Sequence, residues 1–339
     1  MRNSYFLVLN YSIFLLFFAF VAVIISVFTT FASMNERKGC VATVGFFDGV
    51  HRGHQYLIGQ VKEMAKATGR ESAVITFDRH PRQVLHSDYQ PKLLSSLDVK
   101  ELLLSRQNVD RVEVLHFDEA LAGLSAHDFM RDVLRDEYRV ECLVLGYDNR
   151  FGRRNGEECF DDYVAYGKEL GMEVVRAKEW RENMKVSSSQ VRRLLEKGDI
   201  DAANACLGYN YTIVGKVVEG HQNGRQMGFP TANIDTKEWG QLIPAAGVYA
   251  VRVRRQRSMT LMRGMMNIGS RPTFDGDNQT LEVNIFDFRD DIYNEMLLVS
   301  FVKKIRDEHR FDSPDDLAHQ LERDRMEIEQ IFDKETDDE

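Results

Sequence analysis

The segment CVATVGFFDGVHRGH, residues 40–54, has the clearest structural pattern in the chain. Its apolar, β-branched start at 41–44 is followed by Gly45, as expected of a buried strand of a parallel sheet before a tight turn. Residues 55–68 then carry apolar side chains at helical spacing and stop at Gly69. A strand, a glycine-containing loop and a helix in this order direct backbone N–H groups and the helix dipole toward an anion.

Two histidines, His51 and His54, lie three residues apart in this loop. Imidazole rings at this place add neutral or cationic donors that suit the phosphates of a nucleotide. In the alternative interpretation, one histidine caps the helix and the other is only solvated. Asp48 and Gly49 ahead of the pair, and Gly53 between its members, favour the phosphate site.

Strands and helices alternate along the first half of the chain. Strand-like runs cover 71–77, 111–117, 142–148 and 172–177, and helical patterns cover 93–106, 126–138 and 161–170. This alternation predicts a doubly wound parallel sheet, in which ligands bind beyond the carboxyl ends of the strands. The residues that follow predicted strand ends, and that we therefore expect in one shared cleft, are His51, His80, Asp148 and Ser188.

The pattern changes after a predicted connector, where 193–209 reads as two short helices joined by a turn. Short β-branched runs punctuated by glycine follow at 211–218, 247–254, 265–269, 280–288 and 296–305. The next helix starts at Ser313, a good cap with Pro314 after it. Many short strands with one terminal helix predict a small closed β-barrel. The expected divisions are 34–195, a connector at 196–210, a barrel domain at 211–332 and a disordered acidic tail at 333–339.

Charge and cysteine content exclude several classes of protein. The net charge of −9 argues against a nucleic-acid partner, which would favour a basic face. The four cysteines are widely scattered and show no zinc-ligand spacing, so free thiols in a reducing compartment are expected.

The first 33 residues do not fit this picture. From Asn3 to Asn35 there is no charged residue, and a helix over the apolar residues 5–31 would be about 40 Å long, against a hydrocarbon core of about 30 Å. Three explanations stay open: a misassigned start with translation beginning at Met34, a membrane anchor, or a signal peptide. Of the three, we expect the signal peptide least.

Several segments along the chain form recognisable motifs. They are GFFDGVHRGH (45–54), ITFDRHP (75–81), LGYDNRFG (145–152), VSSSQVRRLL (186–195), GRQMGFPTANI (224–234), NIGSRPTF (267–274), LEVNIFDF (281–288), DIYN (291–294) and FVKKIRDEHRF (301–311). Together they resemble the motifs of bacterial bifunctional riboflavin kinase/FAD synthetases, within the wider HxGH nucleotidyltransferases. The resemblance covers about Gly39 to Asp324 and departs from the family at Arg79, where proline is usual, and at Asn149, where an aromatic residue is common.

For the first half, the resemblance implies FMN adenylyltransferase activity, in which the FMN phosphate attacks the α-phosphorus of ATP and pyrophosphate leaves. His51 and His54 would hold the ATP phosphates and stabilise the leaving group. Asp48 would tie the loop or reach the metal. The other implied phosphate ligands are Gly45, Ser187, Ser188 and Arg192, and the implied flavin ligands are Asp148 and Arg150.

For the second half, the resemblance implies riboflavin kinase activity. Glu282 would accept the proton of the riboflavin 5′-hydroxyl as it attacks the γ-phosphate. Thr231 and Asn233 alternate along an extended segment and offer hard oxygen ligands for Mg²⁺ on ATP. Further implied phosphate-binding residues are Gly224, Arg225 and Gly228, and further implied flavin-binding residues are Arg306, Asp307 and Phe311.

The resemblance therefore implies a cytoplasmic two-domain enzyme that makes FMN and then FAD from riboflavin with ATP and Mg²⁺. Its partners would be small-molecule substrates, with membrane contact only through residues 1–33. Two alternatives are a riboflavin kinase that has lost adenylylation because of the departures at Arg79 and Asn149, and a non-catalytic, membrane-tethered flavin-binding protein. The intact histidine pair and the Thr231, Asn233 and Glu282 set argue against the second.

Overall fold

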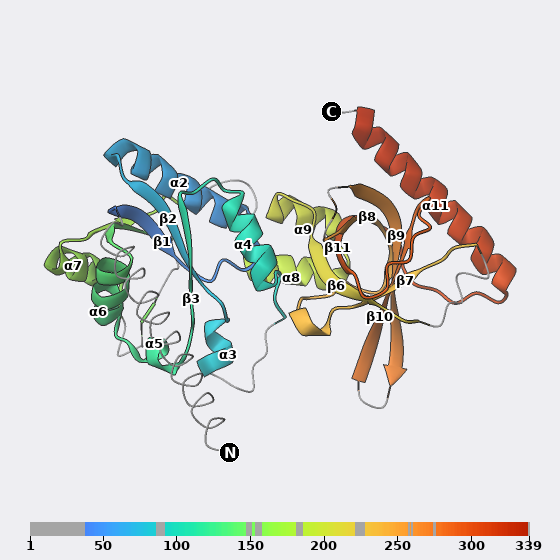
Figure 1. The fold of residues 1–339 in the computed structure, drawn as a ribbon, viewed down its shortest axis with the longest axis horizontal. Coiled ribbons are helices and arrows are strands. Elements are labelled where there is room, and N and C mark those ends of the chain that lie inside the picture. Colours follow the sequence, from blue (N-terminus) through green and yellow to red (C-terminus); the bar gives the residue numbers. More distant parts are fainter. Residues whose placement is uncertain are drawn as a thin grey trace, which may run out of the picture. The chain divides into compact units, whose positions relative to one another are not determined.

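The computed structural model describes residues 38–85, 92–146, 151–152, 158–180, 186–220, 228–256, 258, 260–273 and 276–337 (Figure 1). The predicted N-terminal segment 1–33 and the predicted site residues Asp148, Arg150, Gly224 and Arg225 lie outside these ranges. The described residues form two compact units. One comprises 38–44, Gln60–Ile75 and Val109–Lys178, and the other comprises Gly45–Gly59, Thr76–Asn108 and the chain from Glu179 onward.

The first unit is built on a five-stranded sheet, as the sequence predicts. Its strands are β1 (Cys40–Val44), β2 (Glu71–Phe77), β3 (Arg111–Leu115), β4 (Val140–Leu145) and β5 (Glu173–Arg176), in the order β3-β2-β1-β4-β5. The pairs β1–β2, β1–β4 and β4–β5 are parallel. The strand order reverses between β1 and β4, which is the arrangement of a doubly wound sheet, and all five residues of β1 are buried.

Helices α2 (Arg52–Thr68), α5 (Glu119–Gly123), α6 (Ala126–Asp128) and α7 (Phe160–Leu170) lie between these strands in the chain. Helix α7 ends at Gly171, whose φ of 70° is the left-handed cap conformation. The helix predicted over 126–138 is present, but its part Phe129–Glu137 (η2) has π-helical hydrogen bonding. The predicted strand 111–117 ends at Leu115.

The second unit contains η1 (Asp48–Val50), α3 (Pro81–Leu85), α4 (Leu97–Ser105) and the connector helices α8 (Ser188–Lys197) and α9 (Ile200–Leu207). The two connector helices are those expected from the sequence, and each ends at a left-handed glycine. The helix predicted from residue 93 begins only at Leu97. The reason is that the N–H groups of Leu94 and Ser95 donate to the Asp48 carboxylate, and Leu93 pairs with Gln241 in a β-bridge.

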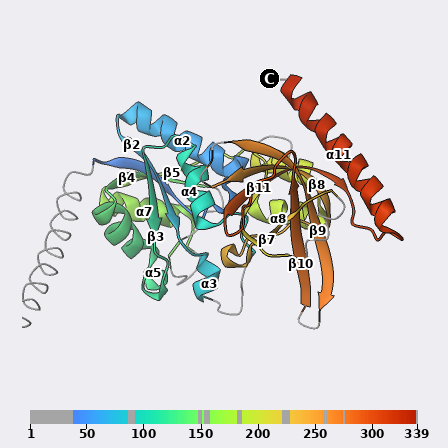
Figure 2. The same cartoon turned by 45° about the vertical axis from the view of Figure 1, so that its right-hand side comes forward.

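The predicted barrel is confirmed: six strands close in the order β10-β7-β6-β11-β8-β9. They are β6 (Thr212–Val218), β7 (Ala232–Asp235), β8 (Gly247–Arg255), β9 (Leu261–Thr273), β10 (Gly276–Ile285) and β11 (Met296–Arg306), with the short η3 (Lys237–Trp239) after β7. Figure 2 shows β9 and β10 as two long ribbons side by side. One apolar core joins the barrel interior to α8 and α9, with members that include Val191, Leu207, Tyr249 and Phe301.

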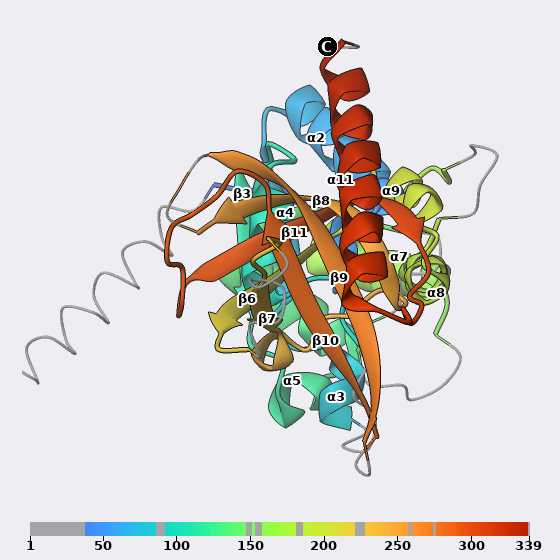
Figure 3. The same ribbon diagram turned by 90° about the vertical axis from the view of Figure 1, so that its right-hand side faces the viewer.

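Helix α11 (Pro314–Asp337) runs along the outside of the barrel against β9 and β11 (Figure 3). Its buried residues Ile328 and Phe332 pack with Val248, Ala250 and Met265. The prediction of a disordered tail from residue 333 is wrong for 333–337, which continue this helix. In the described part of the chain, we find no helix with the length and apolar character needed to cross a bilayer.

Candidate active sites

The loop after β1 has a backbone conformation that non-glycine residues rarely adopt. Phe47, Gly49 and Val50 have φ angles of 53°, 72° and 34°. Left-handed φ values in a phenylalanine and in a β-branched valine cost of the order of ~1–3 kcal/mol each and persist only where the surroundings enforce them. Such positions concentrate at ligand sites, which fits the phosphate loop expected from the sequence.

Side chains from three other places hold this loop by its carbonyl groups. The carbonyl of Asp48 accepts from Ser188 Oγ at 3.0 Å, that of Gly49 from the Tyr209 hydroxyl at 2.6 Å, and that of Val50 from Gln55 Nε2 at 2.8 Å. An added Cβ on Gly49 would lie 2.9 Å from Leu94 Cδ1, so this position also needs glycine for space. These contacts, rather than the intrinsic backbone preferences of its residues, therefore hold the loop in its conformation.

Asp48 ties the loop to two further segments. Its buried carboxylate accepts from Leu94 N at 2.9 Å and from Ser95 N at 3.2 Å, and forms an ion pair with Arg192. Burial raises the pKa of this carboxyl, and the Arg192 guanidinium opposes the shift. Arg192 Nε also donates to the carbonyl of Lys92 at 2.9 Å. The guanidinium expected to bind an anion is thus engaged with Asp48 in this structure.

His51 and His54 stack on each other, with ring centroids 3.6 Å apart. The backbone N–H of His54 donates to His51 Nδ1 at 3.3 Å, so the proton of a neutral His51 ring lies on Nε2. Burial and the neighbouring His51 lower the pKa of His54 well below its usual value. His54 Nδ1 is buried and has no hydrogen-bond partner among the described residues, and unsatisfied buried polar atoms of this kind call for a functional explanation.

The segment after β2 approaches the same loop. The His80 ring lies edge-on to Phe46, with centroids 4.7 Å apart, and Thr76 Oγ1 donates to the Phe46 carbonyl. Burial, together with Arg192, Arg82 and Lys100, lowers the pKa of His80 to about 4. Arg79 is exposed and lies 3.8 Å from Asp78.

Three consecutive serines, 187–189, stand at the start of α8. Ser187, one of the implied phosphate ligands, caps this helix by accepting from Gln190 N. Ser188 and Ser189 already belong to the helix, because it begins at Ser188. The Ser188 hydroxyl is used by the loop, as described above, rather than as a cap.

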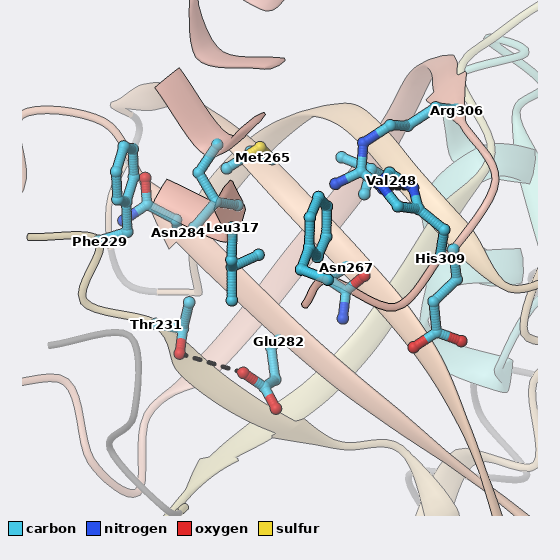
Figure 4. A pocket seen from close by; sticks show the side chains of 13 residues that line it. Phe229, Thr231, Val248, Met265, Asn267, Glu282, Asn284, Arg306, His309 and Leu317 are labelled. Carbon is cyan, nitrogen blue, oxygen red and sulfur yellow. Dashed lines mark hydrogen bonds between the residues drawn. The ribbon is translucent and has the colours of Figure 1, made fainter. Parts of the chain in front are cut away.

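The barrel contains a pocket of about 270 Å³ that lies beneath the start of α11 (Figure 4). Apolar side chains line much of it, and polar side chains stand at two places on its wall. The lining residues are Phe229, Thr231, Val248, Met265, Asn267, Glu282, Asn284, Arg306, Glu308, His309, Phe311, Leu317 and Leu321.

Thr231 and Glu282 form the first polar place. Thr231 Oγ1 lies 3.3 Å from Glu282 Oε2, and Figure 4 shows the two side chains pointing toward each other. Asn233 pairs with Glu282 across β7 and β10, and its side chain lies over Gly220, outside the lining. Asn284 Nδ2 donates to the Pro230 carbonyl at 2.7 Å and so fixes the segment that carries Thr231.

Arg306 and His309 form the second polar place (Figure 4). Arg306 pairs with Asp324 of α11, whose side chain is only 2 % exposed, and its guanidinium lies 5.6 Å from the Phe311 ring. Arg306 and Phe311, two of the flavin ligands implied by the resemblance, both line this pocket. Asp307 does not line the pocket, because its exposed carboxylate pairs with Lys304.

Several of these contacts were not expected from the sequence. Tyr209, Gln55 and Ser95 form hydrogen bonds with the loop after β1, and none of the three belongs to a motif that the sequence analysis singled out. Lys100, by contrast, could be noticed in the sequence. It precedes Leu103 by three residues and Leu104 by four, which places it on the apolar face of a predicted helix. A charged residue on the apolar face of a predicted helix can be recognised from the sequence alone.

A doubly wound sheet with a strained, histidine-bearing loop after β1, joined in one chain to a small barrel with a carboxylate pocket, defines a two-domain nucleotide-dependent transferase. Comparison with known families agrees with this class. The FAD synthetase family model matches residues 33–190, and the riboflavin kinase family model matches residues 207–332. The chain belongs to the family of bifunctional riboflavin kinase/FMN adenylyltransferases.

Individual relatives align over nearly their whole length. The bifunctional riboflavin kinase/FMN adenylyltransferase of Escherichia coli is 37 % identical over 88 % of this chain and 95 % of its own. The protein of the same name from Bacillus subtilis is 35 % identical over 88 % and 94 %. A crystal structure titled macrolide-efflux protein, from Streptococcus pneumoniae, superimposes with a TM-score of 0.76 at 32 % identity, covering 85 % of this chain and 93 % of that one.

Proposed function

We propose that the loop 45–54 carries FMN adenylylation and that the barrel pocket carries riboflavin phosphorylation, the two activities of the family to which the chain belongs. The observation that carries the proposal is the presence of two separate built sites in one chain. One is a strained loop with a buried imidazole nitrogen that has no partner in the described part of the chain, and the other is a pocket with a carboxylate on its wall.

In adenylylation, the phosphate of FMN attacks the α-phosphorus of ATP and pyrophosphate leaves. His54 Nδ1 has no hydrogen-bond partner among the described residues, and the His51 ring stacks on the His54 ring, so we assign the pair to binding phosphate oxygens and stabilising the leaving group. Because Asp48 holds Arg192, we assign both to ordering the loop rather than to direct phosphate contact. The positive start of α8 adds to the same field.

In phosphorylation, Glu282 accepts the proton of the riboflavin 5′-hydroxyl, and the oxygen attacks the γ-phosphorus of ATP. The bond from this phosphorus to the β,γ-bridging oxygen breaks, so that FMN forms and ADP leaves. The apolar wall formed by Phe229, Val248, Met265 and Leu317 suits the flavin ring. Arg306 and Phe311 bind the polar and flat parts of the same ring system. Asp148 and Arg150 stay proposed FMN ligands of the other site, and Gly224, Arg225 and Gly228 stay proposed phosphate ligands of this one.

The oxygen donors around Glu282 fit Mg²⁺. Thr231 presents a hydroxyl oxygen and Asn233, opposite Glu282 in the sheet, an amide oxygen, which are the hard ligands that this ion takes. Substrate phosphates and water would supply the other ligands of the ion. Bound Mg²⁺ would neutralise phosphate charge. Since both reactions consume ATP, we place them in the cytoplasm.

The test uses the full chain with riboflavin, ATP and Mg²⁺, followed by chromatographic separation of the flavins. Accumulation of FAD supports both assignments. FMN without FAD would support the kinase alternative and overturn the assignment of loop 45–54. If neither riboflavin nor added FMN is converted while flavin is bound, the protein is a flavin binder and the proposal is wrong.

A further inference from the structure

Lys100 of α4 is buried without any role in the account so far. Only 2 % of it is exposed, and it shares its helix face with the buried Val99, Leu103 and Leu104. Removing an ammonium group from water is costly unless other groups compensate. The contacts of the Lys100 side chain therefore indicate the role of this residue.

The ammonium group joins two segments of the proposed adenylylation site. Nζ donates to the carbonyl of Phe77, the last residue of β2, at 2.6 Å. It also lies 4.0 Å from the centroid of the Phe46 ring, in the loop after β1, which is cation–π distance. Phe46 in turn contacts His80 and accepts from Thr76. One buried charge thus bridges the segment of His51 and His54 to the segment of His80.

Burial and the nearby charged groups have opposite effects on the pKa of Lys100. Burial lowers the pKa of Lys100 to about 8, although the nearby carboxylates Asp48, Asp78 and Glu101 act in the opposite direction. Arg192 and Lys100 both lower the pKa of His80, so the cationic groups share one region. Since the folded pKa lies below the unfolded value, the burial of Lys100 opposes folding at neutral pH. Stability alone does not explain the residue.

We propose that Lys100 is a positioning residue for FMN adenylylation, which holds Phe46 and the Phe77 carbonyl together so that the histidine loop and the His80 segment keep their relative placement. The proposal rests on the assignment of adenylylation to loop 45–54. It names a residue that does not touch substrate, because its ammonium group is buried among protein atoms.

The test is Lys100→Met in the full chain, with Lys66→Met on the exposed surface of α2 as the matched control. We expect the kcat of FMN adenylylation to fall by about tenfold or more, because small displacements of reacting groups are costly. Riboflavin phosphorylation by the same protein should stay within about twofold, and the unfolding midpoint at pH 7 should not fall. In the unmodified protein, adenylylation should decline as the pH rises through about 8, where Lys100 loses its proton, and Lys100→Met should lack this decline.

Three results would overturn the proposal. Adenylylation within about twofold of the unmodified protein would show that the bridge is not needed. Parallel loss of both activities with a lower unfolding midpoint would show a merely structural residue. An unchanged alkaline decline in Lys100→Met would show that the charge of Lys100 does not matter. If the unmodified protein itself fails to adenylylate FMN, the assignment of loop 45–54 fails instead.

Discussion

The carboxylate of Asp48 accepts a hydrogen bond from Arg192 Nη2, across 144 positions of sequence. This ion pair joins the loop after β1 to α8, the first helix of the connector. The Tyr209 hydroxyl makes a second such link, from just beyond α9 to the Gly49 carbonyl. The conformation of the proposed ATP-binding loop therefore depends on residues of α8 and of the segment just beyond α9, far along the chain.

Asp48→Asn should keep the shape of the side chain and remove its charge. Arg192 then loses its ionic partner, and because its side chain is 22 % exposed, we expect a loss of only ~1–3 kcal/mol in the free energy of unfolding. Adenylylation should fall by about tenfold or more, whereas phosphorylation should persist. Urea unfolding and the two rates measure this, with Asp201→Asn on the exposed side of α9 as control. Unchanged adenylylation would contradict the role given to the pair.

Tyr209→Phe removes one hydroxyl and leaves the ring. Since the lost hydrogen bond holds a strained loop, we expect ~1 kcal/mol less stability and a several-fold lower adenylylation rate. Riboflavin phosphorylation should not change. The exposed Tyr293 provides the control Tyr293→Phe. If both activities decline equally, the hydroxyl supports the fold as a whole and not the loop.

His80→Asn should alter how stability depends on pH. The unfolded chain takes up a proton on this histidine below about 6.5, whereas the folded protein does so only near pH 4. Stability from His80 is therefore present above pH 6.5 and is lost as the pH falls toward 4. Asparagine can still accept from Arg82 N, which His80 Nδ1 now does. Thermal unfolding from pH 7 to 4 should show a weaker acid decline in His80→Asn, and an unchanged decline in the exposed control His319→Asn.

Thr231→Val preserves the shape of the side chain and deletes its hydroxyl oxygen. If Thr231 is a Mg²⁺ ligand beside Glu282, riboflavin phosphorylation should require about tenfold more Mg²⁺ for half-maximal rate. Adenylylation of added FMN should keep its Mg²⁺ dependence. Thr260→Val, at an exposed position, is the matched control. An unaltered Mg²⁺ requirement in the kinase reaction would remove Thr231 from the metal site.

Most of the fold could be predicted because it rests on local periodicity. The apolar run at 41–44, the glycines after α7, α8 and α9, and the Ser313–Pro314 start of α11 each specify their element by their own chemistry. The errors arose where distant groups compete for backbone hydrogen bonds. Helix α4 begins late because the Asp48 carboxylate takes the N–H groups of Leu94 and Ser95.

The site was predictable only in part, for a related reason. His51, Thr231 and Glu282 stand in motifs, so their neighbours in sequence mark them as candidates. The hydroxyl of Tyr209 and the ammonium of Lys100 act across the fold, and no short pattern connects them to the groups that they hold. Arg192 differs from these residues, because the sequence did single it out, as an implied phosphate ligand. In the structure its guanidinium forms an ion pair with Asp48.

The central claim is that each reaction has its own site, and mixing two variants tests it most directly. Glu282→Gln should leave riboflavin unchanged but convert added FMN to FAD, and His51→Asn should stop at FMN. With riboflavin, ATP and Mg²⁺, neither variant alone should yield FAD, whereas their mixture should, because FMN released by one becomes the substrate of the other. A mixture that yields no FAD, or a single variant that loses both activities while still folded, would contradict the account.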